Sequence, residues 1–168
     1  MNAQQLLDYI IKPTLEYIGG NYNSKNAQML LLATAAIESK CGYYIKQING
    51  PALGIWQMEP ETHSDIWLNC DKLQLYKLSD SEVISYRIRS LMTSPDNDAN
   101  TDLIVSPMYA CAMARLKYSM DKAPLPPHDE IFEIYQYYKR IYNTPLGAST
   151  FEKFKSAWFE CELDKIVL

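Results

Sequence analysis

The sequence predicts a mainly α-helical protein with one domain, residues 1–168, and three features support this prediction. The chain is short enough for one domain, and 48% of its 168 residues are hydrophobic, which is enough for a sizeable core. Apolar residues recur at helical spacing in several segments, and glycine and proline separate those segments. We find no internal repeat, low-complexity tract or long linker that would divide the chain.

Two helices are expected in the first quarter of the chain. The first covers residues 7–18, has a kink at Pro13 and ends at Gly19-Gly20. The second runs from about Lys25 to Lys40 and stops near Gly42. Because this second segment is apolar almost all round, we expect it to lie at the centre of the fold.

The middle of the chain alternates loops and shorter helices. Residues 43–58 contain Gly50, Pro51 and Gly54 among short apolar pieces, which favours an irregular loop or a small β-hairpin. A short helix then begins at Pro60 and reaches about Leu68. Further on, Ser79-Asp80-Ser81-Glu82 has the spacing of a capping box and opens a helix to about Leu91, and a polar loop is expected over 93–102.

Three more helices are expected toward the C-terminus. One starts at Ser106-Pro107 and runs to about Met120, where the proline-rich residues 123–127 break it. The next covers residues 130–141 with Asp129 as its cap, and a turn follows over 142–147. Ser149 or Thr150 then caps a last helix that reaches about Glu160.

Charge and cysteine usage limit the classes of function. The formal net charge of −4 argues against a nucleic-acid partner bound through a basic surface, whereas neutral glycans remain suitable partners. The N-terminus lacks the features of a secretory signal, and the longest apolar-rich run, residues 29–37, is far shorter than the roughly 20 residues of a membrane span. We therefore expect no membrane insertion. The dispersed cysteines are expected to be reduced thiols in apolar surroundings: Cys41, Cys70, Cys111 and Cys161.

Glu38 is the candidate catalytic residue. It follows the apolar residues 30–37, so its carboxyl is expected at the edge of an apolar environment. Desolvation raises the pKa of a carboxyl, which then can donate a proton near neutral pH, as the leaving oxygen of a glycosidic bond requires. The alternative from the residues alone is an ordinary helix-end glutamate in solvent or paired with Lys40 or Lys46.

Two sequence motifs, in the same order along the chain, resemble those of the lysozyme-like soluble lytic transglycosylases. The second motif is most similar to the versions found in bacteriophage proteins. The first is Ala36-Ile37-Glu38-Ser39-Lys40-Cys41-Gly42, and the second is Gly50-Pro51-Ala52-Leu53-Gly54-Ile55-Trp56-Gln57-Met58-Glu59-Pro60-Glu61-Thr62. A third feature of that family, a Tyr-Asn pair after a late helix, is matched by Tyr142-Asn143, although the Ala-Gly that usually follows is missing. The resemblance implies a lysozyme-like fold and peptidoglycan as the substrate.

The resemblance also implies roles for individual residues. Glu38 is the expected catalytic acid/base, and Gln57 can bind sugar hydroxyls or an N-acetyl group through its amide. Met58 can form an apolar wall beneath a sugar ring, and Tyr142 can bond the catalytic carboxyl or the sugar. Ser39 and Asn143 complete the expected substrate-binding set. Ser39 can bond the substrate or the loop backbone, and the equal alternative is a local bond to its own helix. From the residues alone, Trp56 and Trp67 are more typical of core residues, and His63 of a surface histidine.

Two chemistries are compatible with the motifs. A lytic transglycosylase uses one glutamate first as acid and then as base on the 6-hydroxyl of N-acetylmuramic acid, which gives a 1,6-anhydro product. A hydrolysing lysozyme instead needs a second carboxylate to position water. The candidates for that second carboxylate are Glu59, Glu61, Asp65, Asp98 and Asp102.

Non-enzymatic readings are a cell-wall-binding virion component and a helical adaptor. No cofactor or metal is expected. The partners expected are peptidoglycan strands and other phage structural proteins, and the expected place of action is the bacterial cell wall, reached from the cytoplasm as a virion-associated protein or a released endolysin.

Overall fold

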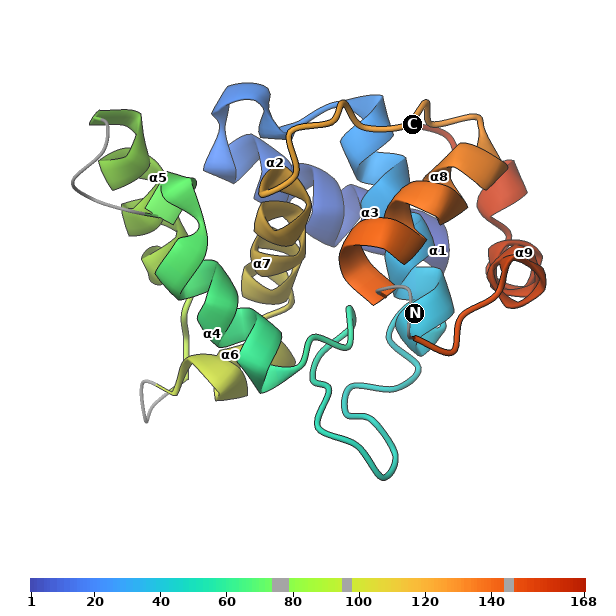
Figure 1. Ribbon diagram of the computed structural model, residues 1–168, viewed down its shortest axis with the longest axis horizontal. Coiled ribbons are helices and arrows are strands. Elements are labelled where there is room, and N and C mark those ends of the chain that lie inside the picture. Colours follow the sequence, from blue (N-terminus) through green and yellow to red (C-terminus); the bar gives the residue numbers. More distant parts are fainter. Residues whose placement is uncertain (74–78, 95–97, 144–146) are drawn as a thin grey trace.

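The computed structural model describes residues 1–73, 79–94, 98–143 and 147–168, and this part of the chain is mainly α-helical. Figure 1 shows the helices gathered around α3 and α7, with a long loop projecting from one end of α3. Buried side chains from α1 through η5 form one hydrophobic cluster. The elements are α1 (Ala3–Leu6), η1 (Leu7–Ile11), α2 (Lys12–Ile18), η2 (Gly20–Tyr22), α3 (Lys25–Ser39), α4 (Pro60–Asn69), η3 (Asp71–Leu73), α5 (Ser79–Ser90), α6 (Ala99–Val105), α7 (Pro107–Ser119), α8 (Ile131–Tyr138), η4 (Lys139–Asn143), α9 (Phe151–Glu160) and η5 (Leu163–Lys165).

The first expected helix is present, but it begins at Ala3, four residues before the predicted start, because Asn2 caps it. Its irregularity takes the form of a π-helical turn. Pro13 has no N–H, so it cannot continue the regular hydrogen-bond ladder. The chain passes from α1 through the π-helical η1 into α2, and Pro13 lies in the first turn of α2. The helix ends at Gly19, whose φ of 78° is readily adopted only by glycine.

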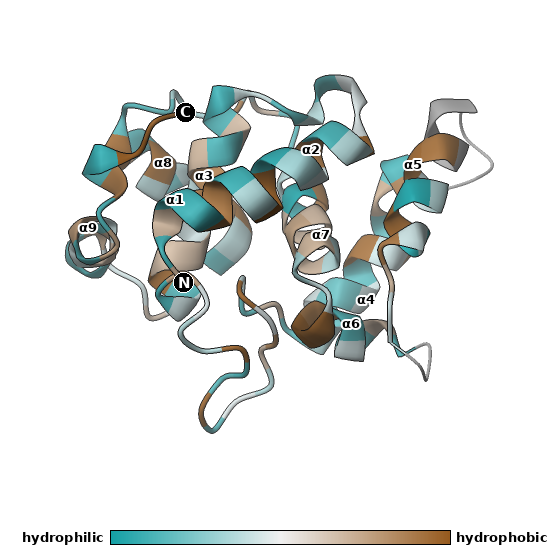
Figure 2. Ribbon diagram, turned by 180° about the vertical axis from the view of Figure 1, so that it is seen from behind, coloured by the Kyte–Doolittle hydropathy of each residue, from teal (hydrophilic) through white to brown (hydrophobic). Residues whose placement is uncertain are grey.

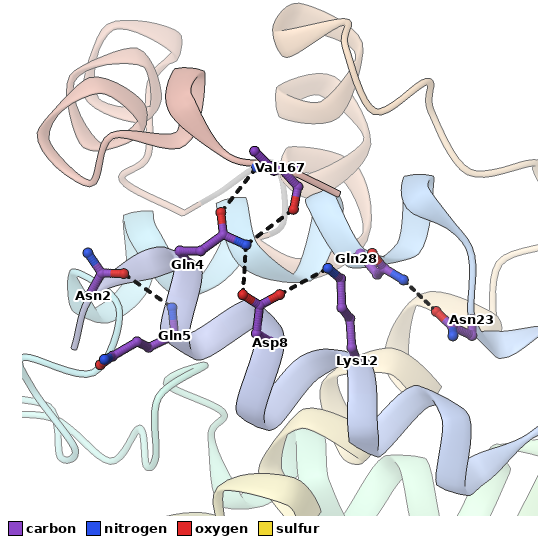
Figure 3. A network of polar contacts seen from close by, with 8 residues as sticks. All are labelled: Asn2, Gln4, Gln5, Asp8, Lys12, Asn23, Gln28 and Val167. Atoms are coloured by element: carbon purple, nitrogen blue, oxygen red, sulfur yellow. Dashed lines mark hydrogen bonds and ion pairs between the residues drawn. The ribbon is translucent and has the colours of Figure 1, made fainter.

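Hydrogen bonds join the N-terminal helix α1 to the C-terminal end of the chain. The amide of Gln4 donates to the carbonyl oxygen of Val167 at 3.1 Å and accepts from the Val167 N–H at 3.1 Å. Gln4 also donates to Asp8, which pairs with Lys12 one turn further on, and Figure 3 shows this polar row along the helix. The C-terminal segment therefore lies against the surface of α1.

The central helix α3 matches the prediction closely. The Ser24 side chain accepts the Ala27 N–H and caps its N-terminus, and nearly every residue from Ala27 to Ala36 is buried. Helix α3 packs against η1, α7, α8 and α9. It ends at Ser39, slightly earlier than expected, because Lys40 and Cys41 both adopt positive φ before Gly42.

The loop between α3 and α4 is irregular, as the sequence predicts. It contains only two isolated antiparallel bridges, Lys46 to Leu53 and Leu53 to Met58. Hydrophobic stretches occur in this projecting loop (Figure 2), and Tyr43 and Ile48 are among its exposed side chains. Helix α4 then starts at Pro60, as expected.

Two local predictions are wrong. The expected polar loop over 93–102 contains the start of α6, because Asp98 caps that helix by accepting the Asn100 N–H at 3.0 Å. Asp129 does not cap α8: the cap residue is Glu130, with no side-chain bond to the helix. Asp98 and Asp129 both lie in short polar segments, and the residue type alone does not indicate which of them caps a helix.

The bounds of α5, α7 and α9 agree with the predictions within about one residue. The helix predicted over 130–141 continues through the π-helical η4 to Asn143, so the first two residues of the predicted turn are helical. Helix α7 is capped by Ser106, and Thr150, not Ser149, caps α9 by accepting the Lys153 N–H. Helix α5 covers the expected range, but the side chains of its expected capping box lie outside the described residues, as does part of the expected turn over 142–147.

Membrane insertion and disulfide bonding were both expected to be absent. No helix in the described ranges is long and apolar enough to cross a bilayer. All four cysteines are free thiols: Cys41, Cys70 and Cys111 are buried, and Cys161 is partly buried.

Candidate active site

The end of α3 and the loop that follows it are joined by the Ser39 side chain. Its hydroxyl donates to the Ile55 carbonyl oxygen at 2.5 Å and accepts the Gly42 N–H at 2.8 Å. Ser39 is only 1% exposed and does not line the pocket described below. The hydroxyl also lies 3.2 Å from the Ala35 carbonyl oxygen of its own helix, so both the bond to the helix and the bond to the loop backbone are present. Ser39 therefore joins the loop to the end of α3 and is not placed to bind substrate.

The glycine of the second motif brings the loop against α6. Gly54 has a φ of 74°, and a Cβ atom there would lie 2.1 Å from the carbonyl oxygen of Leu103. No other residue type fits this approach without displacing the backbone. The loop then turns so that Gln57 and Met58 face the end of α3, with Met58 and Leu53 exchanging both backbone hydrogen bonds at 2.9 Å.

These elements enclose a pocket of about 550 Å³ beside Glu38. Five of the six residues expected at the site line it, namely Glu38, Gln57, Met58, Tyr142 and Asn143. The sixth is Ser39, which lies beneath the loop. The other described residues around the pocket are Gln47, Ala52, Glu59, Thr62, Lys117, Gly147, Ala148 and Ser149.

Glu38 is partly buried, and its carboxylate accepts a hydrogen bond from the Tyr138 hydroxyl at 2.7 Å. Burial raises the pKa of this carboxyl from its usual value near 4.5 to about 7. The Tyr138 hydrogen bond opposes that increase, and the nearby negative charge of Glu59 adds to it. Lys40 does not pair with Glu38, since it forms an ion pair with Glu160 at 3.0 Å. With a pKa of about 7, a substantial fraction of the Glu38 carboxyl is protonated near neutral pH.

Tyr138 is the tyrosine that contacts the carboxyl, although it lies in none of the predicted motifs. Tyr142 donates instead to the Trp56 carbonyl oxygen at 2.9 Å, and so fastens η4 to the second motif. The rings of Tyr138 and Tyr142 stack at 6.3 Å between centroids. Because the two residues are one helical turn apart, the spacing alone could have indicated that both face the same side.

The opposite wall of the pocket supplies polar groups. The Gln57 amide nitrogen donates to the Gly54 carbonyl oxygen at 2.7 Å, and its amide oxygen, which has no partner among the described residues, can accept a bond from a ligand. Asn143 accepts from the Lys139 ammonium at 2.8 Å, and the same ammonium donates to the Gly147 carbonyl oxygen at 2.6 Å. Lys139 thus holds the two ends of this wall together.

Lys117 is a cation at the pocket that was not among the predicted site residues. It lies on α7, and its ammonium is 4.0 Å from a carboxylate oxygen of Asp65 on α4. It belongs to no motif, so only the packing of α7 against α4 brings it to the site.

Of the five candidates for a second carboxylate, only Glu59 lines this pocket among the described residues. Asp102 is fully buried and accepts the Thr93 and Ser94 N–H groups, and Asp98 caps α6. Within the described part of the chain, no cluster of three His, Cys, Asp or Glu side chains is arranged to hold a metal ion.

The histidine and tryptophans near the motif have structural positions. His63 was expected at the surface, but it is 3% exposed and lies between Asn100, at 3.0 Å, and the Tyr109 hydroxyl, at 2.7 Å. The prediction was wrong because both polar partners come from other helices, which no local pattern reveals. Trp56 is buried as expected, and its indole N–H donates to the Leu31 carbonyl oxygen at 2.9 Å.

Comparisons of the chain with protein-family models, curated proteins and solved structures find no match.

Proposed function

We propose that this protein is a peptidoglycan-cleaving muramidase of lysozyme-like fold, and that the pocket beside Glu38 is its active site. The observation that carries the proposal is the Glu38 carboxyl: it lines a polar pocket, its pKa is raised to about 7, and a tyrosine hydroxyl orients it. A carboxyl with these properties can protonate a glycosidic oxygen near neutral pH. The resemblance of both motifs to the soluble lytic transglycosylases supports the same substrate.

The proposed mechanism is that of a lytic transglycosylase acting on the β-1,4 bond between N-acetylmuramic acid and N-acetylglucosamine. Protonated Glu38 gives its proton to the leaving oxygen as the bond breaks. The resulting carboxylate then removes the proton of the muramic acid 6-hydroxyl, whose oxygen attacks the anomeric carbon. This returns Glu38 to its protonated form and leaves a 1,6-anhydro ring.

The pocket offers groups for binding the sugars. The free amide oxygen of Gln57 can accept from a sugar hydroxyl or N-acetyl N–H, and Asn143 offers a second amide. Met58 provides an apolar surface. Lys117 can attract a carboxylate of the muramic acid lactyl group or its peptide.

Glu59 supports a second candidate, a hydrolysing lysozyme on the same scaffold. It is exposed and lines the same pocket, so it could position a water molecule on the opposite face of the sugar ring. In that case the product has a reducing end and not an anhydro ring.

The test is the clearing of purified peptidoglycan, measured as loss of turbidity, by the wild type and three variants. Glu38→Gln should abolish clearing, while Glu61→Gln, an exposed change on α4 outside the pocket, should leave it unchanged. Glu59→Gln should retain clearing if the transglycosylase mechanism holds, and should lose it if Glu59 positions water. A folded wild type that binds peptidoglycan without clearing it would contradict catalysis and favour a cell-wall-binding virion protein.

A further inference from the structure

A second pocket, of about 670 Å³, lies apart from Glu38 and shares none of its described lining residues with the first. It lies between the end of α2, η2, α5, the C-terminal end of α7 and the proline-rich segment after α7. Its volume is within the range of about 300–1,000 Å³ typical of small-molecule sites. Nothing in the proposed cleavage of peptidoglycan uses this pocket.

Arg115 is the unusual residue of this second pocket. It lies on α7 and is only 7% exposed, so its guanidinium is largely removed from water. Its Nε–H donates to the Tyr22 carbonyl oxygen at 3.2 Å, and the guanidinium carbon lies 5.1 Å from the centroid of the Tyr22 ring. No carboxylate of the described residues pairs with it. A buried charge is normally paired, because desolvation without a partner is costly.

The guanidinium of Arg115 keeps donors available on the pocket side. Its Nε–H has a partner, whereas its two Nη groups have none within the described part of the chain, and Arg115 lines the pocket. Two parallel N–H groups on a planar guanidinium match the two oxygens of a carboxylate or phosphate. The geometry therefore fits an oxyanion that would compensate the buried charge.

The other charges around the pocket favour the same kind of ligand. Arg87 and Lys72 also line it, and Arg87 donates to the Ile18 carbonyl oxygen at 2.8 Å through one Nη. Asp121 is the only acidic residue among the described lining residues, and it is already engaged by Arg140 and by the Ala123 N–H. Three cationic side chains and one carboxylate that is already ion-paired thus line the cavity.

Most of the rest of the lining is apolar or aromatic, and Asn21 and Ser119 are its uncharged polar residues. The rings of Tyr118 and Tyr137 lie 5.8 Å apart between centroids, and Ile18, Val83 and Leu125 add aliphatic surface. Such a wall buries a hydrophobic body but offers few partners for a strongly hydrated ion.

We propose that this second pocket binds a small organic anion, with its carboxylate or phosphate on Arg115 and Arg87 and its apolar body against the tyrosines. The proposal does not depend on the activity assigned to Glu38, because it rests on separate residues. A bare inorganic anion would satisfy the arginines alone, so an anion with an apolar body should bind more tightly.

Isothermal titration calorimetry at constant ionic strength tests this proposal. The probes are benzoate and phenyl phosphate, with acetate and inorganic phosphate as anions that lack the ring and benzyl alcohol as the uncharged ring. We expect saturable binding of benzoate or phenyl phosphate, weaker binding of acetate and inorganic phosphate, and none of benzyl alcohol. The preference between benzoate and phenyl phosphate identifies the oxyanion. Absence of saturable binding by all the anions, or equal binding of benzyl alcohol, would overturn the proposal.

Matched variants locate the binding. Arg115→Gln should weaken binding of the better ring anion by roughly tenfold or more, since it removes charge-assisted hydrogen bonds. Arg115→Lys keeps the positive charge but lacks the paired N–H groups of the guanidinium, so its affinity should lie between those of Arg115→Gln and the wild type. Arg87→Gln should also weaken binding, and it provides the test if Arg115→Gln does not fold. The control is Arg89→Gln, which replaces an exposed arginine that lies on α5 with Arg87 but does not line the pocket. This variant should bind the anion as tightly as the wild type does. Unchanged binding in both the Arg115→Gln and Arg87→Gln variants would refute the assignment.

Discussion

Replacing Glu38 with glutamine tests the environment of the carboxyl without any substrate. Glutamine has nearly the same shape and can still accept the Tyr138 hydrogen bond, but it cannot ionise. In the folded protein the pKa of Glu38 is raised from about 4.5 to about 7, mainly by burial. The folded state therefore binds the proton more tightly than the unfolded state does.

The sign and size of the effect on stability follow from this difference. Below pH 4.5 the carboxyl is protonated in both states, so it imposes no penalty on folding. As pH rises from 4.5 through about 7, the unfolded chain ionises first, and the wild type loses stability. At about 1.4 kcal/mol for each pKa unit, the loss reaches about 3 kcal/mol by pH 8. Glu38→Gln lacks this loss, so the variant should be more stable than the wild type by about 3 kcal/mol at pH 8.

Urea denaturation of both proteins at pH 4.5 and pH 8, followed by circular dichroism, measures the difference. The variant and the wild type should differ little at pH 4.5 and by the full amount at pH 8. Glu61→Gln serves as the control, because that side chain is exposed on α4 and should change stability by less than about 0.5 kcal/mol at either pH. An equal stability difference between Glu38→Gln and wild type at both pH values would refute the reasoning, since Glu38 would then titrate alike in the folded and unfolded states.

Three further substitutions test the elements that build the site. Tyr138→Phe removes a hydrogen bond that lowers the pKa of the Glu38 carboxyl, so the pH above which the clearing rate falls should rise. Tyr137→Phe is the control, because the Tyr137 hydroxyl donates to backbone carbonyl oxygens away from Glu38, and it should leave this pH unchanged. Gly54→Ala should reduce the free energy of unfolding by about 3 kcal/mol or more in urea denaturation, because its Cβ meets a backbone oxygen at 2.1 Å, whereas Gly20→Ala has space and should lose only about 1 kcal/mol. Ser39→Ala should lower stability by about 1–3 kcal/mol, since it leaves a buried N–H and a carbonyl without their partner. An unchanged unfolding curve with reduced clearing would instead indicate that this serine contacts substrate.

The sequence predicted most of the helices because their ends are marked locally. Ser24, Ser106 and Thr150 each cap the helix that follows, and Pro60 begins α4. The helix α6 was missed because it is only seven residues long and lies within a polar segment. Short helices of this kind depend on packing, here against α7, more than on their own sequence.

The site was predicted as far as its residues belong to a motif. Glu38 and Gln57 were found because they lie in short segments with a recognisable spacing, and the pocket brings them together. Lys117 belongs to no motif, so only tertiary packing brings it to the pocket. Tyr138 lies one turn before the motif residue Tyr142, which places both on one side of the helix, but its contact with Glu38 depends on the packing of α8. The choice between Tyr138 and Tyr142 depends on the π-helical turn η4 and on the loop it faces, which the spacing alone does not determine.

The raised pKa of Glu38 was anticipated in direction from its apolar neighbours. Its size depends on contributions that the sequence could not supply. Tyr138 lowers the pKa through a hydrogen bond, and Glu59 raises it through its charge. Both act through distances that the folded loop and the end of α8 fix.

Mass spectrometry of the fragments released from purified peptidoglycan tests the central claim most directly, with wild type and Glu38→Gln treated side by side. We predict that the wild type releases muropeptides with 1,6-anhydro ends and that the variant releases none, although both proteins are folded. Equal release of fragments by the variant would contradict the assignment of Glu38 as the catalytic acid and base.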